Sequence, residues 1–291
     1  MASRALLLLI LGAALIGLVP IGVRMCADQP YLIAPLAVAF WRFAFAVPPL
    51  LAWNRWRQRS VDAPARPWLL ACAGLLFGCD IACFFVAITR TSVANATLLS
   101  NLAPLVVAAW STVVERRPPT RGETGGALLA IAGVVLLVAP EARLEGGAHV
   151  VGIALALASA VFYGGYQIAV AHLRRDQPAD RVMTVVAAVA ALVLAPIALI
   201  GGGNLVPDHA GGWGLLIALA VLTQIGGQGL ITWSLAHLAP IFSSVVLLVQ
   251  PVVAIVLAWL LFDQHLGWMQ GAGAVMVMLG IVLAHRGRSA T

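Results

Sequence analysis

Charge is scarce in this sequence, and lysine is absent from it. Of 291 residues, only 10% are charged and 62% are hydrophobic, and the mean hydropathy is +1.00. A soluble fold could not cover its surface with so few polar groups. These proportions exclude a soluble globular protein and predict that a lipid bilayer surrounds the chain. The lack of lysine also excludes chemistry through a lysine Schiff base.

Motifs that mark common classes of enzyme are also missing. We find no Walker A sequence, no glycine-rich dinucleotide turn, no HExxH zinc motif and no G-x-S-x-G nucleophile elbow. The four cysteines lack the paired spacing of a metal site. Three of them fall within one apolar run, where a thiol behaves as a small hydrophobic group. We therefore expect no enzymatic activity, no metal site, no cofactor and no disulfide framework.

The charge that is present is mainly positive. Arginine supplies all 17 basic side chains, against 11 acidic ones, which gives a formal net charge of +6. A basic excess can indicate nucleic-acid binding, but here it sits in short connections between apolar runs, which is typical of membrane topology. We expect the lipid bilayer as a partner and no nucleic acid.

Long apolar runs make up most of the chain. A helix needs roughly 20 apolar residues to cross the hydrocarbon core of a bilayer, and ten runs approach that length. The first run, preceded by Arg4, also has features of a cleaved signal peptide, but the repeat described below needs this helix. The predicted spans are residues 5–23, 32–53, 68–89, 92–114, 123–140, 149–171, 181–200, 213–235, 238–262 and 267–284.

Arginine placement predicts the orientation of these spans. If the N-terminus is cytoplasmic, 13 arginines lie in cytoplasmic segments, three lie outside (Arg24, Arg90 and Arg143), and Arg42 lies within the membrane. Because arginine is retained on the cytoplasmic side, we predict a multi-pass membrane protein with both termini in the cytoplasm. The cytoplasmic set is Arg4, Arg55, Arg57, Arg59, Arg66, Arg116, Arg117, Arg121, Arg174, Arg175, Arg181, Arg286 and Arg288.

The sequence repeats itself at an offset of 147 residues. Glycines and prolines, which have consequences for the backbone, coincide at this one offset. We predict one integral membrane domain made of two repeats, residues 1–145 and 146–291. Because five helices is an odd number, the second repeat is inverted, as in many secondary transporters with a central substrate site. The coinciding pairs are Gly17 and Gly164, Pro104 and Pro251, Gly126 and Gly273, and Gly133 and Gly280.

Specific motifs within this arrangement resemble a known family. Trp41-Arg42-Phe43 lies in the second predicted helix, and the segment TSVANATLLSNLAPL lies around the hairpin between the third and fourth. Together with the paired glycines of the closing helices, these motifs resemble the EamA-type branch of the drug/metabolite transporter (DMT) superfamily. The resemblance covers essentially the whole chain and implies an all-α fold of ten transmembrane helices around a central cavity.

The resemblance also implies a function. The chain looks closest to bacterial exporters of amino acids, with aromatic amino acids favoured. This likeness implies a location in the bacterial inner (plasma) membrane and export of a small-molecule substrate by alternating access. Multidrug or other metabolite efflux is the alternative. A sugar-phosphate or nucleotide-sugar antiporter is disfavoured because such anions need several intramembrane cations, and only Arg42 is available. The inverted repeat argues against a non-transporting membrane scaffold. We expect the protein to act as a monomer.

Two charged residues lie near the centres of predicted spans, where charge costs about 2.5–3.5 kcal/mol or more. Arg42 matches a recurrent arginine of the family, and its planar fork suits a substrate carboxylate. Alternatively, it pairs with Asp80 or caps backbone carbonyls. Asp80 is a candidate for accepting a coupling proton, or for pairing with Arg42 or facing water without any proton cycle.

Uncharged polar side chains in four other spans complete the predicted cavity. Such groups must face protein or water, and each is either part of a cavity lined by both halves or a partner in an interhelical hydrogen bond. With the two charged residues, the predicted substrate-binding set is Arg42, Asp80, Asn101, Tyr163, Gln167, Gln224, Gln228, Ser244 and Gln250.

Two prolines interrupt apolar spans at positions related by the repeat. Pro104 and Pro251 each remove a backbone N–H and bend the helix that contains them. We predict that they are hinges that open and close the cavity on its two sides. The alternative is a static kink tolerated by the neighbouring helices.

Overall fold

The computed structural model describes residues 2–57, 66–91, 93–139, 146–262 and 267–289. In these ranges the chain is helical apart from short connections and one isolated bridge between Ile33 and Asn204. The all-α integral membrane class is therefore confirmed. Arg59 and Arg143, used above to predict orientation, lie outside the described residues, as does the predicted boundary at residue 145.

Each predicted span corresponds to one helix or to consecutive helices. The first half contains α1 (Ala2–Ile16), α2 (Val19–Ala27), α3 (Pro35–Trp56), α4 (Pro67–Ala87), α5 (Val93–Ser100), α6 (Ala103–Val113) and α7 (Arg121–Val138). The second half contains α8 (Gly146–Leu173), α9 (Ala179–Ile200), α10 (Ala210–Leu219), the π-helix η2 (Ala220–Gly227), α11 (Gln228–Ser234), α12 (Pro240–Val246), α13 (Val249–Phe262) and α14 (Trp268–Ser289).

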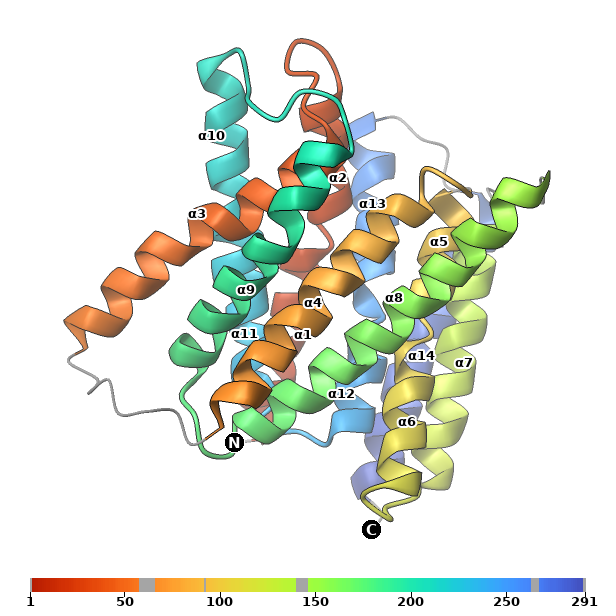
Figure 1. The fold of residues 1–291 in the computed structure, drawn as a ribbon. Helices are drawn as coiled ribbons and strands as arrows, with labels where there is room; N and C mark the ends of the chain where they lie inside the picture. The colour runs from red at the N-terminus through yellow and green to blue at the C-terminus, as the bar shows by residue number, and fades with distance from the viewer. Residues whose placement is uncertain (1, 58–65, 92, 140–145, 263–266, 290–291) are drawn as a thin grey trace.

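Local sequence explains where many of these helices begin. Proline occupies the first turn of α2, α3, α4, α6 and α12, where its missing N–H would have had no partner within the helix. At α7, Thr120 and Glu123 form a capping box, in which the Glu123 N–H donates to the Thr120 hydroxyl at 3.1 Å. In the described part of the chain, nine helices are long and apolar enough to cross a membrane. Helix α7 is not among these nine and packs along α14 (Figure 1).

Contacts between the halves obey the predicted offset of 147 residues. A Cβ atom added to Gly17 would lie 2.8 Å from Cβ of Val253, and one added to Gly164 would lie 2.8 Å from Cβ of Val106. Adding 147 to 17 and to 106 gives 164 and 253, so the two contacts are the same contact with the halves exchanged. Such an exchange is the property of a two-fold axis.

Helices α7 and α14 show the same exchange at closer range. A Cβ atom on Gly126 would lie 2.5 Å from the carbonyl oxygen of Gly280, and one on Gly273 would lie 2.5 Å from that of Gly133. These residues lie one above another on the two facing helices. Only residues without side chains allow the backbones this close. The helices that close the two repeats are therefore packed tightly along their length.

The fourth and ninth spans are broken rather than kinked. The gap between α5 and α6 lies just before Pro104, and the gap between α12 and α13 lies just before Pro251. Each proline is thus in the first turn of a new helix, where it needs no N–H partner. The expectation of a bend within a continuous helix is corrected accordingly. Broken helices near the middle of a membrane fold are typical of transporters, because their exposed backbone ends line a cavity.

Candidate functional site

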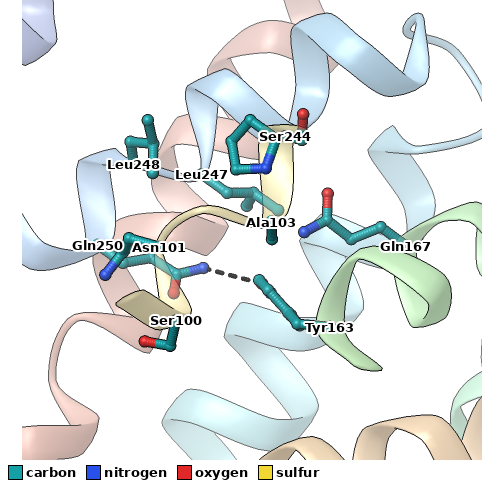
Figure 2. A pocket seen from close by; sticks show the side chains of 10 residues that line it. Ser100, Asn101, Ala103, Tyr163, Gln167, Ser244, Leu247, Leu248 and Gln250 are labelled. Carbon is teal, nitrogen blue, oxygen red and sulfur yellow. Dashed lines mark hydrogen bonds between the residues drawn. The ribbon is translucent and has the colours of Figure 1, made fainter. Parts of the chain in front are cut away.

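A small cavity lies between the two broken helices and α8. It is lined by both halves of the chain, and the Gln250 side chain reaches Tyr163 within it (Figure 2). Its volume is about 10 Å³, which is room for roughly one water molecule. The ten lining residues, all uncharged, are Ser100, Asn101, Ala103, Pro104, Tyr163, Gln167, Ser244, Leu247, Leu248 and Gln250. A metabolite can enter only after the surrounding helices have moved apart.

Most polar groups of this cavity have partners within the protein. Gln250 Nε2 donates to the hydroxyl of Tyr163 at 3.3 Å, which links α13 to α8. Asn101 Nδ2 donates to the carbonyl of Thr97 at 2.7 Å, and the Ser244 hydroxyl donates to the carbonyl of Ile241 at 2.7 Å. The last two bonds return to their own helices, next to the breaks. They stabilise helix ends that lack continuing backbone partners.

Gln167 is the exception in the cavity. Its side chain is 2% exposed, yet neither Nε2 nor Oε1 has a hydrogen-bond partner. Figure 2 shows the side chain extending from α8 toward Ala103. Burying an amide without partners costs about 1–3 kcal/mol. This is an expensive arrangement for a residue whose only role is packing.

Arg42 and Asp80 lie outside the lining of this cavity and are both buried. The Ser159 hydroxyl donates to Asp80 Oδ1 at 2.5 Å, and the Arg42 guanidinium lies 5.0 Å from the centre of the Phe43 ring. No direct ion pair joins the two charged side chains, so that alternative is corrected, although their charges act on each other at longer range. Arg42 Nε has no hydrogen-bond partner.

Gln224 and Gln228 also lie outside the cavity lining. Gln228 Nε2 donates to the hydroxyl of Tyr166 at 2.8 Å, and the Tyr166 ring stacks on Phe77 with centroids 4.3 Å apart. Gln224 is in the π-helix η2, with its Oε1 unpartnered. π-Helical turns are rare and often occur at functional positions. Gln228 thus bonds to the α8 residue next to Gln167, which lines the cavity.

Four lining residues were predicted neither as substrate-binding residues nor, like Pro104, as hinges. Ser100, Ala103, Leu247 and Leu248 flank the two helix breaks and line the cavity because of their place in the chain. Two of them are leucines, which nothing distinguishes from the many others in so apolar a sequence. The sequence signal that could have found them is the proline after each break, because residues within one turn before that proline line the cavity.

Two side-chain contacts lie at opposite ends of the molecule, at positions related by the repeat. At the end that holds both termini (Figure 1), His172 Nε2 of α8 lies 3.4 Å from Glu115 Oε1, just beyond α6. At the other end, the guanidinium of Arg24 in α2 lies 4.2 Å from the centre of the Phe262 ring, the last residue of α13. Adding 147 to 115 gives 262, and adding it to 24 gives 171, adjacent to His172. Equivalent helix ends of the two halves therefore meet through different contacts. One is a histidine beside a carboxylate, and the other is an arginine over an aromatic ring.

A helical membrane fold of two related halves, with a polar cavity between broken helices, defines a membrane transporter. The chain belongs to the EamA-like transporter family, whose model matches it twice, over residues 3–139 and 150–286. Membership of this family indicates a transporter rather than an enzyme.

Known proteins of similar length match nearly the whole chain. The pseudopaline exporter CntI of Pseudomonas aeruginosa is 25% identical over 246 residues, covering 84% of each chain. The inner membrane protein YtfF of Escherichia coli is 25% identical over 301 residues, covering 94% of this chain and 92% of that one. A solved crystal structure superimposes with a TM-score of 0.79 at 21% identity, covering 98% of both chains, and shares the fold.

Proposed function

We propose that this transporter exports small organic metabolites across the bacterial inner membrane, with amino acids, and aromatic ones in particular, as the favoured substrates. The observation that carries the proposal is the cavity between the halves, whose ten lining residues combine amide and hydroxyl groups with apolar walls and carry no charge. Sites for small ligands have this mixture. The stacked rings of Phe77, Tyr163 and Tyr166 beside it suit an aromatic side chain.

The export direction and location are supported by two further observations. The similar proteins include one named an exporter and one named an inner membrane protein. The arginine bias favours cytoplasmic termini, and Figure 1 shows both termini at the same end of the molecule. We also propose that the protein acts as a monomer, because each chain contains a complete cavity.

Alternating access through this cavity requires the two ends to open in turn. We propose that the contact between Glu115 and His172 closes the cytoplasmic end and that the contact between Arg24 and Phe262 closes the outer end. Both contacts are formed here, around a cavity too small for an amino acid. Opening one end while the other stays closed would expose the cavity to one side at a time.

A multidrug or other metabolite exporter is the second candidate, supported by the same neutral cavity. A carrier of sugar phosphates or nucleotide sugars fits poorly, because Arg42 does not line the cavity and no other cation does. A multiply charged anion would lose its hydration there with no countercharge to replace it.

Flux through purified protein tests the proposal. Proteoliposomes and protein-free liposomes are loaded in parallel, and uptake of radiolabelled aromatic and aliphatic amino acids is measured with and without a pH gradient. Saturable, protein-dependent flux of aromatic amino acids supports the proposal. If no amino acid moves but a drug or another metabolite does, the second candidate replaces it. If no solute moves under any gradient, the proposed function is wrong.

A further inference from the structure

The turn of α8 that faces the cavity carries three polar side chains, and only one of them lacks a partner. Tyr163 accepts from Gln250, and Tyr166 accepts from Gln228. Gln167, one helical turn after Tyr163 on the same face, has a free donor at Nε2 and a free acceptor at Oε1. The hydroxyls of the two tyrosines therefore have hydrogen-bond partners, whereas the amide of Gln167 has none.

The residues next to Gln167 in α8 make apolar contacts with the neighbouring helices. The next residue, Ile168, packs with Val107 and Ile241 in a small apolar cluster. One turn earlier, Gly164 lies against Val106 of α6. The amide is therefore held between apolar contacts and directed at the cavity, beside Ala103 (Figure 2).

We propose that Gln167 is the specificity-determining residue that binds the head group of the substrate, and that this head group carries no net charge but presents a hydrogen-bond acceptor and a donor side by side. The zwitterionic α-amino acid group has this chemistry: its carboxylate accepts from Nε2 and its ammonium donates to Oε1. The inference rests on the proposed function and names the recognition chemistry of the same cavity.

The charge of the cavity sets the selectivity. All ten lining residues are neutral, so a zwitterion satisfies both halves of the amide and brings in no net charge. A lone anion or a lone cation leaves one amide atom unpaired and is itself buried without a countercharge. Sites built to bind a polar group reject analogues that lack it far more strongly than apolar pockets reject a missing methylene.

Ligand-induced thermal stabilisation of the purified full-length protein tests this without relying on flux. The probes share one ring and differ only in the head group: L-phenylalanine (zwitterion), phenethylamine (cation) and 3-phenylpropionate (anion). For the wild type we expect half-maximal stabilisation at a concentration at least about tenfold lower for phenylalanine than for either analogue.

Two variants at one position separate recognition from folding. Gln167→Met keeps the length of the side chain but removes both hydrogen-bonding atoms, so the concentration needed for phenylalanine should rise roughly 10- to 100-fold and approach that of the analogues. Gln167→Glu should shift preference toward phenethylamine, because a carboxylate attracts the ammonium and repels a substrate carboxylate. Gln270→Met is the matched control: Gln270 is buried on α14, bonds to the Gly267 N–H at 2.8 Å, and lies outside the cavity.

Each possible result either overturns or supports the inference. The inference is overturned if the wild type binds all three probes equally or prefers the anion, or if Gln167→Met keeps the wild-type ratios. It is equally overturned if none of the probes stabilises the wild type, whereas protein-dependent flux of amino acids in proteoliposomes would in that case leave the proposed function standing. A change of ratio at Gln167 with unchanged ratios in Gln270→Met supports it.

Discussion

The hydroxyl of Ser159 donates a 2.5 Å hydrogen bond to Asp80 Oδ1, joining α8 to α4. The positions related by the offset of 147 are Gly12 and Gly227, and a Cβ atom on Gly12 would lie 2.8 Å from the carbonyl oxygen of Gly227. One crossing of helices is thus held by a polar bond, and its counterpart by close backbone packing. The two halves share a fold but differ in how this crossing is stabilised.

Replacement of Ser159 tests how much its hydrogen bond to Asp80 contributes to stability. Ser159→Ala should lower the free energy of unfolding by about 2 kcal/mol, because it leaves a buried carboxyl group with one partner fewer. Thermal unfolding in detergent measures the effect. Ser234→Ala is the control: this serine is equally buried but bonds only to Leu230 in its own helix, so its loss should cost clearly less. Equal losses in both variants would contradict the prediction.

Asp80→Asn tests proton coupling separately from folding. Asparagine keeps an oxygen that accepts from Ser159, so the variant should fold and exchange substrate at equilibrium. We expect it to lose any stimulation of flux by a pH gradient, because its amide cannot carry a proton through the cycle. The measurement is flux into proteoliposomes that hold the variant or the wild type, with and without the pH gradient. Stimulation equal to the wild type would exclude Asp80 as the coupling residue.

Removing the contact between His172 and Glu115 should loosen the cytoplasmic end. His172 Nε2 lies 3.4 Å from Glu115 Oε1, and His172→Ala removes the ring that makes this contact. In this variant we expect a cysteine placed by Ser244→Cys, in a background without native cysteines, to react faster from the cytoplasmic side than it does with His172 present.

Two further variants act as controls for this end of the molecule. His172→Gln, whose amide can still donate to the Glu115 carboxylate, should raise the labelling rate less than His172→Ala does. Phe262→Ala should instead speed labelling of the same cysteine from the outer side, because it removes the ring that Arg24 contacts. If neither substitution changed the rate of labelling, the assignment of the two contacts to the two ends would be wrong.

Tight packing of α7 on α14 predicts the effect of adding a side chain. Gly280→Val should destabilise the protein by about 3 kcal/mol, because a Cβ atom there would lie 2.6 Å from the carbonyl oxygen of Gly126 and 2.7 Å from the Ala130 nitrogen. Gly271→Val on the same helix meets nothing within 4 Å and is the control. Melting temperatures in detergent compare the two. A small effect at Gly280 would show that the helices can separate cheaply.

The two helix breaks make a prediction about rate rather than stability. Replacing both Pro104 and Pro251 with alanine lets each pair of segments join into one stiffer helix, so turnover in proteoliposomes should fall several-fold. Pro196→Ala, inside the continuous helix α9, should affect turnover less. Unchanged turnover in the double variant would exclude the hinge role.

The helices and their pairing could be predicted from the sequence because the signals are strong. Apolar runs long enough to cross a bilayer gave the spans to within a few residues. Gly126 and Gly273 carried structural information because a backbone can approach so closely only where no side chain intervenes. Their spacing therefore predicted the offset that the contacts between the halves obey.

The partners of the buried polar groups could not be predicted in the same way. Arg42 and Asp80 are placed correctly in the membrane but do not pair, and Asp80 bonds to Ser159, which is 79 residues away in the chain. Of the predicted glutamines, Gln167 and Gln250 line the cavity, whereas Gln224 and Gln228 do not.

The partners could not be predicted because lipid, rather than water, surrounds these helices. In water, the contrast between polar and apolar faces indicates how a helix is turned, but here lipid and protein core are both apolar, and the periodicity carries little of that information. The sequence by itself therefore determined which segments cross the membrane and that the two halves are related. The rotation of each helix about its axis, and hence which amide is left free at the cavity, was decided only by packing in the tertiary structure.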